Sequence, residues 1–308
     1  MVSAQPVAPC FPFVQFELTQ GLGPAPGRYL VRSGAEAAGG GPRAEPSFGS
    51  DDILTIQIHG AAAARRGLLR RGGRTVTEGP SPREVSITVA TFIRGTLCMP
   101  DGESAQRWLA SMKAVEQQEA WTADGLRVVN QAVSAYRACA ADPHVADVSR
   151  DDPRAVRIGF GSADEVYRGR WTQAVGVLLP AAPKLPRQVM LMPTQAVTAV
   201  LSGQSRTLEA EDLLLRVRVD VDQRRRRAAA VGLRAAVELL LAELAGEQLS
   251  EKAQRLLDVV IAAQPEVRAL AEQARSAPLP VTDGVRLAAI ADQAGALVDR
   301  WRYEPLGF

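Results

Sequence analysis

The stretch RRRRAAAVGLRAAVELLLAEL, residues 224–244, joins a block of four arginines to apolar residues at helical spacing. The large apolar positions recur every three or four residues: Leu233, Val237, Leu240, Leu241 and Leu244. This spacing predicts a helix with one apolar stripe, which needs a partner surface and therefore favours a helical bundle. The arginine block is either the solvated start of that helix or an anion-binding patch, and the sequence leaves both alternatives open.

Helical periodicity of the same kind recurs through the C-terminal third of the chain. The segments that show it are residues 208–221, 225–245, 251–263, 266–275 and 283–301. We therefore predict an all-helical bundle of about five helices over residues 206–308. Prolines punctuate the stretch before it, so residues 181–205 are predicted to be a proline-containing linker.

Residues 1–180 mix strand-like and helix-like patterns, which predicts a mixed α/β domain with a small, mainly antiparallel sheet. The chain as a whole is thus predicted to be α+β. Alternating apolar residues on both sides of a Gly-Pro turn predict a β-hairpin over residues 11–32. Two strand-like runs flank residues 61–83, which contain six arginines and one acidic residue, Glu78, and are predicted to form an exposed basic loop.

The charge of the whole chain is nearly balanced, with 36 basic and 34 acidic residues and a formal net charge of +2. This charge is too small to indicate a nucleic acid or a membrane as a partner of the entire surface. All but three of the basic residues are arginine, a bias typical of GC-rich codon usage, so an arginine-rich stretch need not be functional. The odd number of widely spaced cysteines, and the lack of an apolar run of roughly 20 residues, favour a cytoplasmic protein with reduced thiols.

Catalytic and metal-binding patterns are sparse. The two histidines, His59 and His144, belong to no cluster with metal-ligand spacing, so neither a metal nor a cofactor is predicted. Residues 156–161 look like a strand that enters a glycine-rich phosphate loop, but Asp164 stands where the third glycine of a dinucleotide fingerprint would be. No catalytic residue is assigned. An enzyme with an unrecognised site near residues 159–171 is the third hypothesis for the function.

The first hypothesis is a non-enzymatic protein-interaction or scaffold protein that binds another protein or a second copy of itself through exposed arginine-rich surfaces and the helical domain. The alternative is a nucleic-acid-binding or regulatory protein in which the same arginines contact phosphates. Both hypotheses use one set of contact residues, which lie on the basic loop, in a Gly-Arg-Trp sequence and at the start of the quoted helix: Arg65, Arg66, Arg70, Arg71, Arg170, Trp171, Arg224, Arg225, Arg226 and Arg227.

Overall fold

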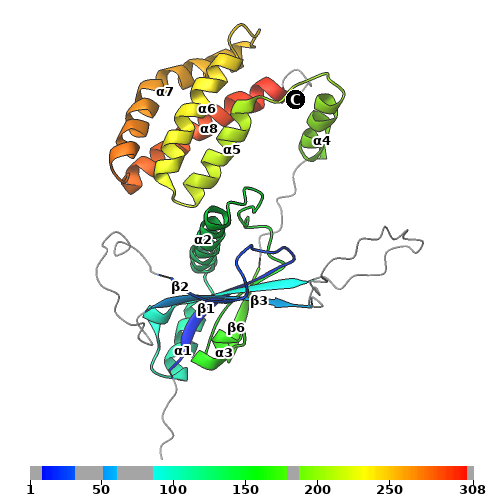
Figure 1. Cartoon of the computed structure of the whole chain (residues 1–308). Helices are drawn as coiled ribbons and strands as arrows, with labels where there is room; N and C mark the ends of the chain where they lie inside the picture. The colour runs from blue at the N-terminus through cyan, green and yellow to red at the C-terminus, as the bar shows by residue number, and fades with distance from the viewer. Residues whose placement is uncertain (1–8, 32–50, 61–85, 179–186, 304–308) are drawn as a thin grey trace, which may run out of the picture. The chain divides into compact units, whose positions relative to one another are not determined.

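The computed structural model describes residues 9–31, 51–60, 86–178 and 187–303 (Figure 1). The chain divides into two compact units, Met1–Ala181 and Ala182–Phe308, which we call the sheet unit and the helical unit. Each unit buries core clusters made of its own residues. An antiparallel sheet in the first unit and helices in the second confirm the predicted α+β class.

The sheet has six strands in the order β2-β3-β4-β1-β5-β6, and every neighbouring pair is antiparallel. The strands are β1 (Phe11–Leu18), β2 (Gly27–Val31), β3 (Asp52–His59), β4 (Ile87–Ile93), β5 (Ala155–Gly161) and β6 (Gln173–Val177). β3 and β4, the strands that flank the predicted basic loop, pair with each other.

The hairpin predicted over residues 11–32 is wrong. β1 pairs with β4 and β5, whereas β2 pairs with β3. The physical reason is burial: β1 is buried along nearly its whole length and needs a strand on each side, while β2 is largely exposed and suits an edge. Local alternation of apolar residues indicates a strand but not its partner.

The two faces of the sheet pack against different helices. Because side chains alternate along a strand, Phe16 of β1 points into a large core that includes helix α2 (Val115–Ala140). Phe13 points to the opposite face and packs near Val166 of helix α3 (Ala163–Tyr167). Figure 1 shows α2 and α3 on opposite sides of the sheet.

Helix α2 approaches the sheet most closely at a glycine. A Cβ at Gly125 would lie 2.3 Å from Cγ1 of Val14, so a larger residue would push the helix away from β1. Trp108 of the preceding helix contacts Trp121 of α2 edge-on, with ring centroids 5.0 Å apart. The other helices described in this unit are η2 (Gly95–Leu97), a 3-10 turn, and α1 (Gly102–Ser111), which contains Trp108.

The helical unit contains α4 (Arg187–Leu201), α5 (Glu209–Asp222), α6 (Arg226–Glu243), α7 (Glu251–Ser276) and α8 (Val281–Tyr303). The stripe quoted at the start of the sequence analysis lies in α6 and at its C-terminal end. Its residues Leu233 and Leu240 are fully buried in the core of this unit. The predicted stripe therefore does meet a partner surface, which α5, α7 and α8 provide.

Two predictions for this part of the chain need correction. The segments 251–263 and 266–275 form one helix, α7, with Pro265 inside it. A proline removes one backbone hydrogen bond, and the buried Val260 and Val267 on either side of it keep both halves packed on the same core. The predicted linker, residues 181–205, contains helix α4, whose Ala196 and Ala199 are buried.

Candidate functional site

The predicted contact residues fall in three places, of which the structure describes two. Arg65, Arg66, Arg70 and Arg71 lie outside the described residues. Arg170 and Trp171 lie in the turn formed by residues 168–172, between α3 and β6, which we call the central turn. Residues 224–227, between α5 and the first turn of α6, are called the arginine block.

The central turn is closed by a single carboxylate. Helix α3 starts with a capping box, in which Glu165 accepts hydrogen bonds from the backbone N–H of Ser162 at 2.9 Å and from its hydroxyl at 3.0 Å. The same carboxylate oxygen accepts a hydrogen bond from Oγ1 of Thr172 at 2.8 Å. These bonds, above all the one from the Ser162 backbone, lower the pKa of Glu165 from its ordinary value. Glu165 therefore ties the start of α3 to the end of the turn.

Two glutamines of the sheet bind the backbone in and next to the central turn. Nε2 of Gln15, a residue only 2% exposed, donates hydrogen bonds to the Gly169 carbonyl and to Oγ1 of Thr91, each at 3.0 Å. Nε2 of Gln57 donates to the Tyr167 carbonyl at 3.3 Å. Gly169 has a φ of +67°, and a Cβ there would lie 2.7 Å from Oε1 of Gln57, so this position favours glycine. The backbone that precedes Arg170 is thus fixed to the sheet.

The central turn presents Arg170 and Trp171 to solvent. Arg170 is exposed, and Trp171 keeps 37% of its surface exposed. The indole lies beside Phe13, with ring centroids 6.2 Å apart, and the guanidinium carbon of Arg157 lies 5.3 Å from its ring centroid. Arg157 also forms an ion pair with Glu17. The indole is therefore supported on the protein side and open on the other, a setting typical of residues that anchor interfaces.

Gly159 and Gly161, in the segment of the enzyme hypothesis, lie where two parts of the backbone come close together. A Cβ at Gly159 would lie 2.4 Å from the carbonyl oxygen of Gln173 on the neighbouring strand β6. A Cβ at Gly161 would lie 3.2 Å from the Cα of Trp171 in the central turn. Close backbone approach accounts for both glycines without a bound phosphate. The structure brings residues 159–171 together around the start of α3, as a packed turn.

Two members of the arginine block bind carbonyls at the end of α7 and in the connection that follows it. Nε of Arg227 donates to the carbonyl oxygen of Ala274 at 2.6 Å, and its Nη2 donates to that of Arg275 at 3.1 Å. Nη1 of Arg226 donates to the carbonyl oxygen of Leu279 at 3.3 Å. The last carbonyls of a helix have no partner within it, and a cation there also opposes the negative end of the helix dipole. These two arginines therefore cap α7 and hold the connection to α8.

The other two members of the block differ from each other. Nη1 of Arg225 lies 3.2 Å from Oδ1 of Asp220, a carboxylate whose side chain is only 7% exposed. Arg224 has a φ of +57° and is exposed, and within the described residues its side chain makes no hydrogen bond or ion pair. Among the residues that the structure describes, three members of the block thus bond to groups of their own unit, and Arg224 does not.

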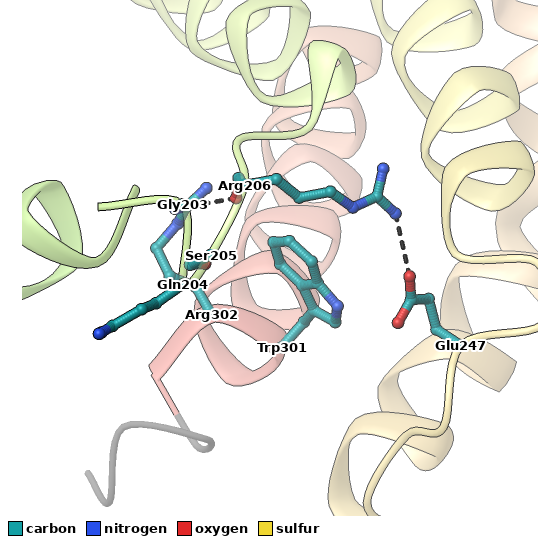
Figure 2. Close-up of a pocket in the computed structure, with 7 residues that line it drawn as sticks. All are labelled: Gly203, Gln204, Ser205, Arg206, Glu247, Trp301 and Arg302. Carbon is teal, nitrogen blue, oxygen red and sulfur yellow. Dashed lines mark hydrogen bonds and ion pairs between the residues drawn. The ribbon is translucent and has the colours of Figure 1, made fainter. Parts of the chain in front are cut away.

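A pocket of about 400 Å³ in the helical unit was not predicted from the sequence (Figure 2). Nη2 of Arg206 donates to the carbonyl of Glu243 at 3.1 Å and to the carboxylate of Glu247 at 3.0 Å. The residues that line the pocket come from the segment between α4 and α5, the segment between α6 and α7, and the end of α8: Gly203, Gln204, Ser205, Arg206, Glu247, Trp301 and Arg302. No local motif links three segments so distant in the sequence.

No further feature of the described residues identifies a reaction. They contain no group of three or more His, Cys, Asp or Glu side chains placed to hold a metal ion. None of the helices in the described part of the chain is long and apolar enough to cross a membrane. Comparisons of the chain with protein-family models, curated proteins and solved structures find no match. The function has to be inferred from the geometry itself.

Proposed function

We propose that this protein is a non-enzymatic interaction protein that binds a protein partner through the central turn. The observation that carries the proposal is Trp171, whose indole is 37% exposed on a turn held by Gln15, Gln57 and Glu165. A rigid aromatic side chain loses little conformational entropy when a partner covers it, so most of the free energy of burying it appears as affinity. Arg170 beside it supplies charged donors at the rim of the contact.

The bonding of the arginine block supports a protein partner over nucleic acid. Phosphate contacts need arginine donors that are exposed and free to turn outward. Arg225 faces a buried carboxylate, and Arg226 and Arg227 donate to backbone carbonyls of their own unit. Among the described members of the block, Arg224 alone makes no bond within its own unit. Fewer donors are therefore left for phosphate than the run of four arginines indicates, and the salt dependence of binding to this block is expected to be weak.

A capture experiment with matched variants tests the proposal. Full-length wild-type protein, W171A and L97A are coupled to beads and exposed to the same nuclease-treated cell extract, and bound proteins are quantified by mass spectrometry. Leu97 is the control, because it is an apolar residue of the same unit that is 46% exposed and lies in η2. We expect a specific protein on wild-type and L97A beads that falls at least about tenfold on W171A beads, the loss typical of an interface anchor.

Two results would contradict this function. Equal recovery of the captured protein on W171A and wild-type beads would show that Trp171 is not the anchor. Without nuclease, nucleic acid that elutes as the salt concentration rises would favour the phosphate-binding alternative. Circular dichroism of W171A excludes loss of the fold as the cause of any lost binding. Light scattering of wild-type protein over a range of concentrations tests whether the partner is a second copy of the chain.

A further inference from the structure

The pocket of the helical unit combines an indole with a partly unused guanidinium group (Figure 2). We propose that it binds a small molecule that carries a planar ring and a carboxylate, with the ring against Trp301 and the carboxylate on Arg206. The volume of about 400 Å³ lies within the range of small-molecule sites, about 300–1,000 Å³. This inference concerns the helical unit and does not depend on the central turn.

The indole of Trp301 is open toward the pocket. It is half-buried, and it packs against the core of the helical unit. The guanidinium carbons of Arg206 and Arg302 lie 5.9 Å and 5.7 Å from its ring centroid. Both distances lie within the cation–π range of about 6 Å. The part of the indole that remains exposed lines the pocket, where a planar ring can contact it.

Arg206 supplies the donors for a carboxylate. Its Nη2 is occupied by the Glu243 carbonyl and by Glu247, while its Nε and Nη1 make no hydrogen bond with the residues that the structure describes. The side chain is 53% exposed, so these donors are accessible. Arg302, by contrast, is 10% exposed and is used internally, because it binds Glu211 and the Arg206 carbonyl. Nε and Nη1 lie on different edges of the guanidinium plane, so a carboxylate there accepts a single charge-assisted hydrogen bond from either donor.

The charges around the pocket select the ligand further. The two arginines of its lining are each paired with a carboxylate, Arg206 with Glu247 and Arg302 with Glu211, so the unused donors of Arg206 are the feature that favours a carboxylate over an ammonium group. Glu247 lies beside Arg206, and a doubly charged phosphate would be repelled by it more strongly than a single carboxylate would. Gln204 and Ser205 line the same pocket, and within the described residues their side chains make no hydrogen bond, so they can bond further polar groups of the ligand. A monocarboxylate with a ring fits these conditions.

Fluorine NMR with two probes of opposite charge tests the proposal. The full-length protein is titrated with 4-fluorobenzoate or 4-fluorobenzylamine up to about 10 mM, since fragments of this size bind in the millimolar range. The variants are R206Q and W301L, with R234Q as the control. Arg234 lies on α6 and pairs with Glu238 at 3.0 Å, away from the residues that line the pocket.

We expect 4-fluorobenzoate to bind wild-type protein and R234Q with equal affinity, and to bind R206Q about tenfold more weakly because the charged donor is lost. W301L should weaken binding as well, but R206Q decides the result, because Trp301 also packs against the core. The proposal fails if 4-fluorobenzoate does not bind wild-type protein, if R206Q binds it as tightly as wild-type protein does, or if the amine binds as tightly as the carboxylate.

Discussion

The central turn and the arginine block both place arginine in a short connection before a regular element, yet they use it in opposite ways. In the central turn the backbone is held by Gln15, Gln57 and Glu165, and Arg170 points to solvent. In the arginine block the arginine side chains themselves bind the neighbouring backbone. Arg227 binds a carbonyl at the end of α7, and Arg226 binds one in the connection that follows. The first region exposes its side chains because other residues fix it, and the second uses its side chains to fix its neighbours.

The difference teaches that a run of arginines is not by itself a binding surface. What decides its role is whether unsatisfied carbonyls or carboxylates lie within reach. The end of α7 provides such carbonyls for the arginine block. The carbonyls of Gly169, in the central turn, and of Tyr167, just before it, already accept hydrogen bonds from glutamines of the sheet. They are therefore not left for Arg170 to bind.

The largest effect on stability is expected from a substitution that disturbs the contact between the central turn and the sheet. Gly169→Ala places a Cβ 2.7 Å from Oε1 of Gln57 in a backbone with a φ of +67°, which we expect to lower the free energy of unfolding by about 2 kcal/mol. Urea unfolding followed by tryptophan fluorescence measures this. Gly176→Ala is the control, because a Cβ there meets nothing within 4 Å. Equal stability of the two variants would mean that the turn is not held as described.

A pair of variants in the arginine block sharpens the comparison. Arg227→Ala removes the donors for two carbonyls at the end of α7, and we expect it to lower the free energy of unfolding by about 1 kcal/mol. Arg224→Ala removes an exposed side chain, and the expected change is within about 0.5 kcal/mol. Urea unfolding followed by circular dichroism distinguishes them. A larger loss for Arg224→Ala than for Arg227→Ala would contradict the assignment of the block.

The smallest expected effect concerns the acid dependence of the central turn. The pKa of Glu165 is lowered in the folded state from an ordinary value of 4.5, so the ionised carboxylate stabilises the fold above that pH. This contribution is lost as the pH falls through the lower folded-state pKa. The stability difference between wild-type protein and Glu165→Gln should therefore be present at neutral pH and shrink below about pH 4.5. Urea unfolding at several pH values checks this, and a difference that grows in acid would contradict it.

Much of the candidate site follows from sequence patterns that act over a few residues. Acidic residues are favoured in the first turn of a helix, and Asp164 and Glu165 stand there in α3, which begins with a capping box. Arg170 and Trp171 were selected as contact residues from the sequence alone. The glutamines that hold the turn could not be found in this way, because Gln15 and Gln57 lie on strands more than 100 residues earlier and are adjacent to it only in the folded sheet.

The sequence by itself determined the class of fold and most of the helices and strands, since helical and strand periodicity depend on which residues a single element must bury. The apolar stripe at residues 233–244 predicted a packed helix without any knowledge of its neighbours. Only the tertiary structure decided that β1 lies in the middle of the sheet, that Arg227 caps α7, and that Arg206 meets Trp301 at a pocket. Each of these depends on contacts between segments far apart in the chain, and no local pattern specifies which strand edge, carbonyl or ring will be within reach.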